Sequence, residues 1–185
     1  MIVPLRKDDA LLSDISAAED REDAFHLWWL GQSGFLVKWQ GQFLLFDPYL
    51  SDSLTRKYEE TDKPHVRMTE LVLDPGRLDF VRHVTSSHNH TDHLDGETLT
   101  AIASASGAMT LVLPAANIDF ARGRLGDVPI DYLGLDAGIA RAEGPWEFEG
   151  VPAAHNEVER DEEGKCRFLG FLVRFGAFTV YHSGD

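Results

Sequence analysis

The six residues from His88 to His93 (HNHTDH) constrain this chain more than any other feature of its sequence. The apolar segment Val81–Ser87 comes directly before them and predicts a short strand. His88 and His90 are two residues apart, so on an extended segment both imidazoles point the same way and can bind one cation. Asp92 and His93 follow at a turn, where they can reach a second cation. The fold must therefore present a strand end at which two metals can activate one water.

The first part of the chain predicts an antiparallel meander and then a long loop. Three aromatic and aliphatic runs are separated by turn sequences, at Phe25–Leu30, Phe35–Trp39 and Phe43–Phe46. Residues Tyr49–Leu73 are polar and mixed in charge, and we expect a loop with one helical turn there. Long loops in compact domains often form a wall of a binding site. The residues before Asp23 predict an irregular or helical lead-in.

Helices and strands are both expected in the rest of the chain. Asp95 is a good N-cap for a helix that runs to Ser106, and Pro114 precedes a second helix, Ala115–Arg122, that ends near Gly123. Further strands are expected at Thr110–Leu113, Ile130–Leu133, Trp146–Phe148, Val151–Ala154, Arg167–Phe175 and Phe178–His182. Strands outnumber helices and helices lie between some of them, so we predict an α/β or α+β fold. The length favours a single domain, residues 1–185.

Charge and composition exclude several classes of protein. The formal net charge is −14, from 31 acidic and 17 basic residues, and a field of that sign repels nucleic acids and anionic membranes. We therefore expect a small-molecule substrate, although bound divalent cations would reverse the sign locally and admit a phosphorylated compound. The single cysteine, Cys166, excludes an internal disulfide framework, and no segment is typical of a membrane span or signal peptide. These features predict a cytoplasmic protein and leave a homo-oligomer open.

Two isolated residues can join the histidine-rich run from other strand ends. His155 follows the apolar run Val151–Ala154, and Asp185 follows Phe178–His182 after a short turn. A sheet brings such strand ends together and presents their loops on a rigid scaffold. Together with the run, these residues form a set of imidazoles and carboxylates that favours Zn, Mn or Fe over Cu.

Other polar side chains have simpler interpretations. His182 is expected to be a hydrogen-bonded residue of an inner face, or one that supports a ligand, rather than a ligand itself. Arg56, Lys57 and Arg67 fall in the long polar loop, where we expect solvated surface charges. The alternative is that they bind an anionic group of the substrate.

The order of these motifs resembles that of the metallo-β-lactamase superfamily. The resemblance is carried by H-x-H-x-D-H at His88–His93, then the lone His155, then a strand ending in S-G-D at Asp185. Two shorter motifs near the start, W-L-G-Q-S-G-F and L-F-D-P-Y-L-S-D-S, look like the branch of L-ascorbate-6-phosphate lactonase-like hydrolases. Together the motifs run from about Trp28 to Asp185, which is most of the chain.

The resemblance implies a role for each residue of the histidine-rich run. His88, His90 and His155 would hold a first metal ion, and Asp92 and His93 would hold a second. Asp92 would also orient the attacking hydroxide.

Two further aspartates receive roles from the same resemblance. Asp185 would bridge the two metals. Asp47, which follows the third predicted strand, would support the metal-binding loop through hydrogen bonds without ligating a metal.

The resemblance also implies a four-layer αβ/βα sandwich, of which this sequence supplies the first part. The family usually adds a further histidine ligand from a later strand, whereas this sequence ends at Asp185. We therefore expect a piece of a longer protein that is truncated at the C-terminus. Its second metal site would be incomplete, and one sheet would keep an open edge.

The expected activity is that of a lactonase-like, metal-dependent hydrolase in which a metal-bound hydroxide attacks a small ester or lactone. Two divalent metal ions are the expected cofactors, Zn or Mn, with Fe as an alternative. The lactonase-like motifs imply a phosphorylated sugar-acid lactone as one substrate. One alternative is a phosphodiesterase that acts on a phospholipid or nucleotide with the same centre. Another is a metal-binding protein without catalytic activity.

Overall fold

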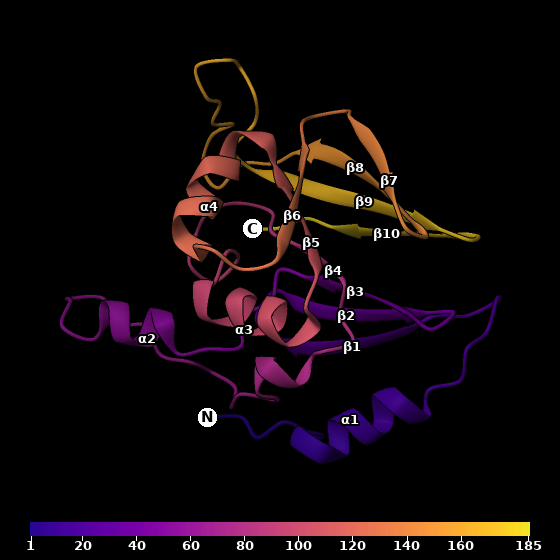
Figure 1. Cartoon of the computed structure of the whole chain (residues 1–185). Helices are drawn as coiled ribbons and strands as arrows, with labels where there is room; N and C mark the ends of the chain where they lie inside the picture. Colours follow the sequence, from indigo (N-terminus) through magenta and orange to yellow (C-terminus); the bar gives the residue numbers. More distant parts are fainter.

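The computed structural model describes residues 1–185 as two β-sheets and a set of helices (Figure 1). The strands of the larger sheet are β1 (His26–Gly31), β2 (Gly34–Trp39), β3 (Gln42–Phe46), β4 (His83–Thr85), β5 (Met109–Pro114) and β6 (Ile130–Leu135). The smaller sheet consists of β7 (Ala140–Glu143), β8 (Trp146–Pro152), β9 (Leu169–Phe175) and β10 (Phe178–His182). The helices are α1 (Asp8–Ala17), α2 (Ser53–Tyr58), α3 (Gly96–Ser106) and α4 (Ile118–Leu125), with 3₁₀ turns η1 (Pro75–Arg77) and η2 (Ala115–Asn117).

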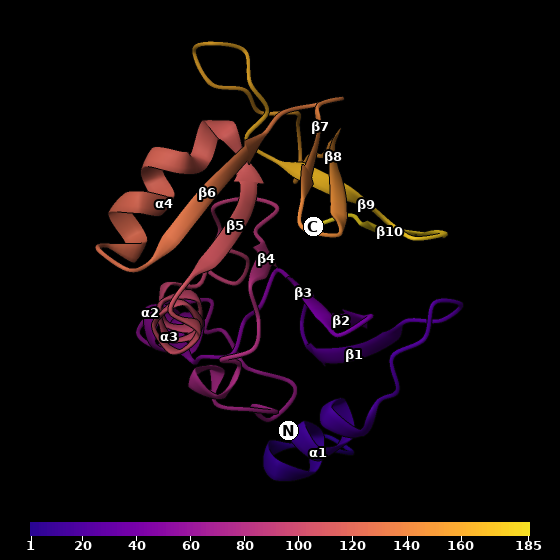
Figure 2. The same cartoon turned by 45° about the vertical axis from the view of Figure 1, so that its right-hand side comes forward.

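The larger sheet joins an antiparallel half to a parallel half. Strands β1, β2 and β3 form the predicted meander, and β4, β5 and β6 continue the sheet in parallel from β3. Parallel neighbours need crossover connections: the segment with α2 and η1 connects β3 to β4, α3 lies between β4 and β5, and α4 lies between β5 and β6. Figure 2 shows these two helices on one side of the larger sheet and the smaller sheet on the other. The result is a layered α/β sandwich, which confirms the predicted fold class.

Each face of the larger sheet has its own hydrophobic core. Neighbouring residues of a strand point to opposite faces, and β3 shows this clearly. Leu45 belongs to the core beneath the helices, together with Leu99 of α3. Leu44 belongs to the core between the sheets, together with Phe148 of β8. The continuous apolar run in β3 is therefore that of a strand buried on both faces.

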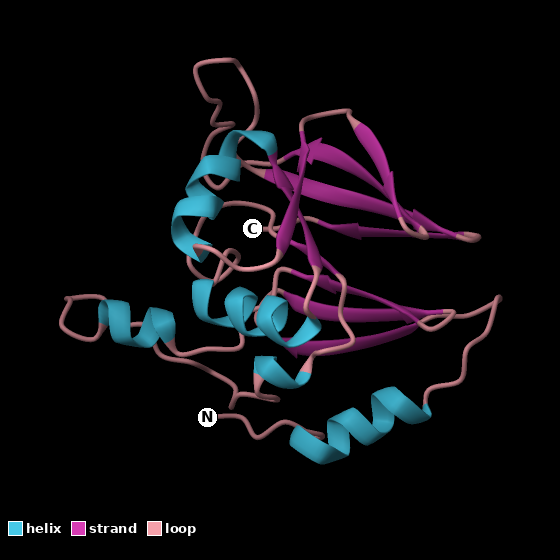
Figure 3. Ribbon diagram, viewed as in Figure 1, coloured by secondary structure: helices cyan, strands magenta, loops and turns pink.

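Loops gather at one side of the molecule. In Figure 3 they lie toward α2 and α4, whereas tight hairpin turns lie at the opposite end of the strands. The parallel strands end on the loop side, where binding sites of α/β proteins usually form. None of the helices is long and apolar enough to cross a lipid bilayer.

The helix expected at Ala115–Arg122 begins and ends later than predicted. Its first turn is the 3₁₀ turn η2, and α4 continues through Gly123 to Leu125. The helix ends at Gly126, whose φ of +67° suits glycine better than other residues. Gly126, and not the expected Gly123, therefore ends the helix.

Two predicted strands, Trp146–Phe148 and Val151–Ala154, are one strand, β8. Gly150 suggested a turn between them, but it lies inside the strand where another segment crosses closely. A Cβ atom at this position would lie 2.5 Å from the carbonyl oxygen of Asp136. The glycine therefore permits a close backbone approach rather than a turn. Strand β7 was not predicted, because its side chains are mostly exposed and have no apolar pattern.

Candidate metal centre

The six predicted site residues all follow strand ends on the loop side of the molecule. They are His88, His90, Asp92, His93, His155 and Asp185. The first four follow β4 of the larger sheet, and the last two follow β8 and β10 of the smaller sheet. Both sheets therefore contribute to one site. Figures 1 and 2 show the C-terminus beside the end of β10.

The carboxylate of Asp185 lies between imidazoles on two sides. Its Oδ2 atom is 3.8 Å from His88 Nε2 and 3.7 Å from His155 Nε2. Its Oδ1 atom is 3.3 Å from His93 Nε2. Nitrogen and oxygen ligand atoms of His88, His90 and Asp185 also lie within 4.8 Å of one another. Each carboxylate oxygen thus faces a different group of imidazoles.

His90 and Asp92 complete the cluster. The His90 ring centroid lies 4.5 Å from that of His88 and 5.1 Å from that of His155. Asp92 Oδ2 lies 3.9 Å from His93 Nε2. The structure therefore brings all six residues together, and their role as ligands stays a prediction.

The hydrogen bonding of the buried His88 imidazole shows whether a metal ion fits this cluster. His88 is 1% exposed, and its Nε2 atom has no hydrogen-bond partner. An unsatisfied buried polar atom costs about 1–3 kcal/mol, which a cation in front of Nε2 would offset. Neutral imidazoles and carboxylates are also the ligands that Zn, Mn and Fe accept. The residues present fit a divalent metal centre.

Asp47 forms hydrogen bonds to the loop that carries the histidines of this cluster. It follows β3, is fully buried and has a φ of +34°. Its carboxylate accepts hydrogen bonds from Thr85 Oγ1 at 2.7 Å, the Ser87 amide at 3.0 Å and His93 Nδ1 at 2.8 Å. The Ser87 hydroxyl also donates to Asp47 and accepts from His88 Nδ1 at 2.9 Å. The predicted hydrogen bonds of Asp47 to this loop are confirmed, and they direct Nε2 of both histidines toward Asp185.

The buried groups have shifted pKa values. Burial lowers the pKa of His88 to about 3, and repulsion by His93 and His90 adds to this, so its imidazole is neutral at pH 7. Burial opposes ionisation of Asp47, but the hydrogen bond from His93 and the charges of His182 and His93 hold its pKa well below the usual range. Burial also opposes the charge on His93, and the hydrogen bond and charge of Asp47 outweigh it and raise its pKa. A neutral His88 is the form that binds metals.

Gly184 of the S-G-D motif brings Asp185 over the end of β4. Its φ is +73°, and a Cβ atom there would lie 2.8 Å from both Cβ and Oγ of Ser87. Any larger residue would push the segment away from the larger sheet. The motif therefore has a physical role in closing the site.

His182 is a hydrogen-bonded inner residue, as expected. Its Nε2 atom lies 2.9 Å from the carbonyl oxygen of Ser33, and its Nδ1 accepts from the amide of Gly184 at 3.3 Å. The ring stacks on Phe46 with centroids 5.1 Å apart. These contacts tie β10 to the larger sheet and thereby position Asp185.

The sequence analysis missed several side chains that hold the ligand loop. Thr85 and Ser87 had a visible signal, since they are hydroxyl residues at the end of an apolar strand. Arg124 of α4 had none, yet its Nη1 donates to the carbonyl oxygens of Asn89 at 2.9 Å and Leu94 at 3.0 Å. A surface arginine on a helix is common, so only the fold reveals this contact.

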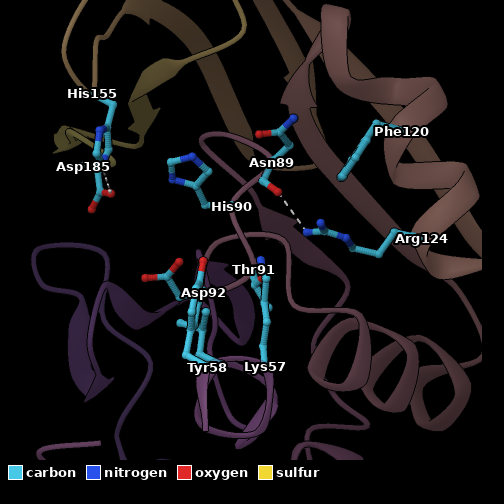
Figure 4. A pocket seen from close by; sticks show the side chains of 11 residues that line it. Lys57, Tyr58, Asn89, His90, Thr91, Asp92, Phe120, Arg124, His155 and Asp185 are labelled. Carbon is cyan, nitrogen blue, oxygen red and sulfur yellow. Dashed lines mark hydrogen bonds and ion pairs between the residues drawn. The ribbon is translucent and has the colours of Figure 1, made fainter. Parts of the chain in front are cut away.

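A pocket of about 460 Å³ opens onto the cluster (Figure 4). Four of the predicted ligands lie on it, including His90. Helix α2 contributes Lys57 and Tyr58, and α4 contributes Phe120 and Arg124. The cluster is thus accessible to a small molecule.

Comparison with known proteins identifies the family. Residues 26–185 match the model of the β-lactamase superfamily domain. The chain belongs to the metallo-β-lactamase superfamily. Among curated relatives, a UPF0173 metal-dependent hydrolase of Desulforamulus reducens is 26% identical over 163 residues, covering 86% of this chain and 61% of that protein. The chain spans about three fifths of the length of such relatives.

Solved structures of the metallo-β-lactamase superfamily share the fold. A possible metal-dependent hydrolase from Veillonella parvula has a TM-score of 0.64 at 19% identity, over 87% of this chain and 62% of that one. CmlA from Streptomyces venezuelae, a diiron β-hydroxylase, has a TM-score of 0.60 at 22% identity, over 91% of this chain and 30% of that one. These likenesses show the fold alone. The predicted superfamily is confirmed, and the lactonase-like branch stays a prediction.

Proposed function

We propose that the protein is a metal-dependent hydrolase that uses two divalent ions to cleave a small ester or lactone. The observation that carries the proposal is the position of Asp185, whose two oxygens face His88 and His155 on one side and His93 on the other. Membership of the superfamily and similarity to relatives named metal-dependent hydrolases support it.

Each residue of the cluster has a proposed role. His88, His90 and His155 hold one ion, and His93 and Asp92 hold the other. The network around the buried carboxylate holds Nδ1 of His88 and of His93, so that Nε2 of each imidazole faces the proposed ions.

Asp185 and Asp92 belong to the cluster and also line the pocket. Asp185 is the proposed bridge. Two ions held here would supply Lewis acidity and a water of lowered pKa. Asp92 accepts a hydrogen bond from Gln32 Nε2 at 3.4 Å through Oδ2, and its carboxylate would help to hold the second ion and orient that water.

The finer assignments are part of the same proposal. The lactonase-like motifs favour a lactone, including a phosphorylated sugar-acid lactone, and the ligand set favours Zn or Mn, with Fe as an alternative. CmlA is a diiron β-hydroxylase with this fold, so the fold by itself does not select hydrolysis. A cytoplasmic location and a small-molecule substrate complete the proposal.

Metal content and turnover test the proposal together. The full-length protein, loaded with Zn or Mn, is assayed for bound metal and for hydrolysis of δ-valerolactone, phenyl acetate and bis(4-nitrophenyl) phosphate. Asp92→Ala is expected to lower kcat about 100-fold or more, since it removes the group that positions the water. Asp62→Ala changes an exposed aspartate of the long loop and is the matched control.

Each outcome decides between the candidate functions. Lactone or ester turnover that Asp92→Ala abolishes supports the proposal. A strong preference for the phosphodiester favours the phosphodiesterase, and metal binding without turnover of any probe contradicts catalysis.

A further inference from the structure

The pocket beside the metal centre contains a lysine without a carboxylate partner. Three of the five lysines, Lys7, Lys38 and Lys165, form ion pairs, whereas Lys57 and Lys63 form none. Lys57 lines the pocket, and its Nζ lies 3.3 Å from Thr91 Oγ1. The side chain of Lys57 is exposed, and Nζ also lies 5.1 Å from the centroid of the Tyr58 ring.

The other cations of this region already have partners. Arg56 forms an ion pair with Glu97. Arg67 is buried rather than solvated, and its guanidinium donates to three main-chain carbonyl oxygens. Arg124 donates to two carbonyl oxygens of the ligand loop. Of the charges expected on the loop surface, only Lys57 is free to meet a substrate.

Helix α2 places Lys57 on the wall of the pocket that opens onto the cluster. The helix is tied to the start of α3, because Ser53 Oγ donates to Asp95 Oδ1 at 2.8 Å. In Figure 4 the side chains of Lys57 and Tyr58 both extend from α2 toward the loop that carries Asp92. A positive charge thus lies on the pocket wall beside the reacting groups.

We infer that Lys57 selects substrates that carry a compact anionic oxygen group, a carboxylate or a phosphate, in addition to the bond that is cleaved. The inference rests on the proposed hydrolase function and adds a substrate class to it. The net charge of −14 repels anions at long range, so a cation at the pocket wall favours their binding locally. A lysine suits this role, because its ammonium is a mobile point charge with three donors.

A matched set of aryl acetates tests the inference. Two probes are anionic, 4-acetoxybenzoate and 4-acetoxyphenyl phosphate, and the third, 4-acetoxybenzamide, is neutral. Lys57→Gln is expected to raise KM for the anionic probes about fivefold relative to KM for the amide, the effect of one partly exposed ion pair. Lys57→Arg keeps the charge and should restore the ratio, and Lys63→Gln should match the wild type.

The ratio of KM values decides the inference and identifies the anion. An effect on one anionic probe alone shows whether a carboxylate or a phosphate is preferred, and supports the inference for that group. An unchanged ratio in Lys57→Gln contradicts it.

Binding without turnover separates this inference from the proposed function. The dissociation constant of 4-hydroxybenzoate is measured by calorimetry, with 4-hydroxybenzamide as the neutral control. If the wild type hydrolyses none of the esters, the hydrolase proposal fails for esters, and this binding alone decides the inference. Equal affinity of wild type and Lys57→Gln for the benzoate would show that the lysine does not bind the anion.

Discussion

The two sides of the metal centre are built in different ways. On the buried side, His88 and His93 are each 1% exposed, and the Nδ1 atom of each is held by the network around Asp47. On the open side, the side chains of His155 and Asp185 are 46% and 43% exposed. They come from the smaller sheet and have no comparable buried support. One side is therefore fixed by buried hydrogen bonds, whereas the other lies open to solvent.

Because of this difference, we expect changes on the two sides to affect stability and metal affinity differently. Changes on the buried side leave buried donors unpaired, so they should weaken both the fold and the site. Changes on the open side remove ligands that solvent can replace, so they should weaken metal binding alone.

The largest loss of stability is expected for Asp47→Ala. The change leaves the hydroxyl of Thr85, the amide and hydroxyl of Ser87 and the imidazole of His93 without their shared acceptor. We expect the free energy of unfolding to fall by about 3 kcal/mol, as when one partner of a buried pair is removed. Urea denaturation of the metal-free protein measures it.

Asp185→Ala is the matched change on the open side. We expect the unfolding free energy of its metal-free form to stay within about 0.5 kcal/mol of wild type, as for most surface changes. Its metal binding should nevertheless be lost. Equal destabilisation by the two aspartate variants would contradict the distinction between the two sides.

A smaller effect is expected for His155→Ala. Removing an exposed ligand should weaken metal binding at least about tenfold, while the denaturation midpoint of the metal-free protein stays the same. Competition with a chromophoric chelator measures the affinity. His26→Ala removes a histidine of β1 outside the cluster and should leave the metal affinity unchanged, whatever the loss of its contact with the Glu19 carbonyl oxygen does to stability. Unchanged affinity in His155→Ala would remove this residue from the site.

Gly184 joins the two sides, and its substitution should have an intermediate effect on both. Gly184→Ala combines a positive φ with a contact to Ser87, and we expect a loss of about 1–3 kcal/mol of stability together with weaker metal binding. Gly164→Ala is the control, because its φ is +82° but no atom lies within 4 Å of the added Cβ. The difference between the two variants measures the contact with Ser87. Identical behaviour would show that this contact is unimportant.

The smallest expected effect is a change in the pH dependence of stability, caused by His83 at the opposite end of β4 from the cluster. Burial lowers its pKa below the usual 6.5. The folded state therefore binds this proton less tightly than the unfolded state. The resulting stability is present above pH 6.5 and is lost as the pH falls below that value. Unfolding free energies at pH 7.5 and 5.5 should differ less in His83→Gln than in wild type, and an equal difference would assign the pH dependence to other groups.

Local sequence patterns predicted much of the fold. Asp95 was expected to cap a helix, and its side chain accepts a hydrogen bond from the amide of Thr98 at 3.2 Å. The apolar runs predicted the meander, because burial on both faces leaves a continuous pattern. Gly150 and Gly123 misled the prediction, since a glycine indicates a turn, a helix end or a close approach equally well. Only the neighbours in space distinguish these cases.

For the candidate site, too, some features follow from the local sequence and others only from the tertiary structure. The chain alone determined which residues are able to bind metals, because ligand type and spacing are local properties of His88–His93. Tertiary structure decided that Asp185 lies between the two groups of imidazoles, that Asp47 orients them, and that Lys57 is the unpaired cation of the pocket. These facts depend on where two sheets and three loops meet. Such contacts join residues far apart in the chain, and no local pattern records them.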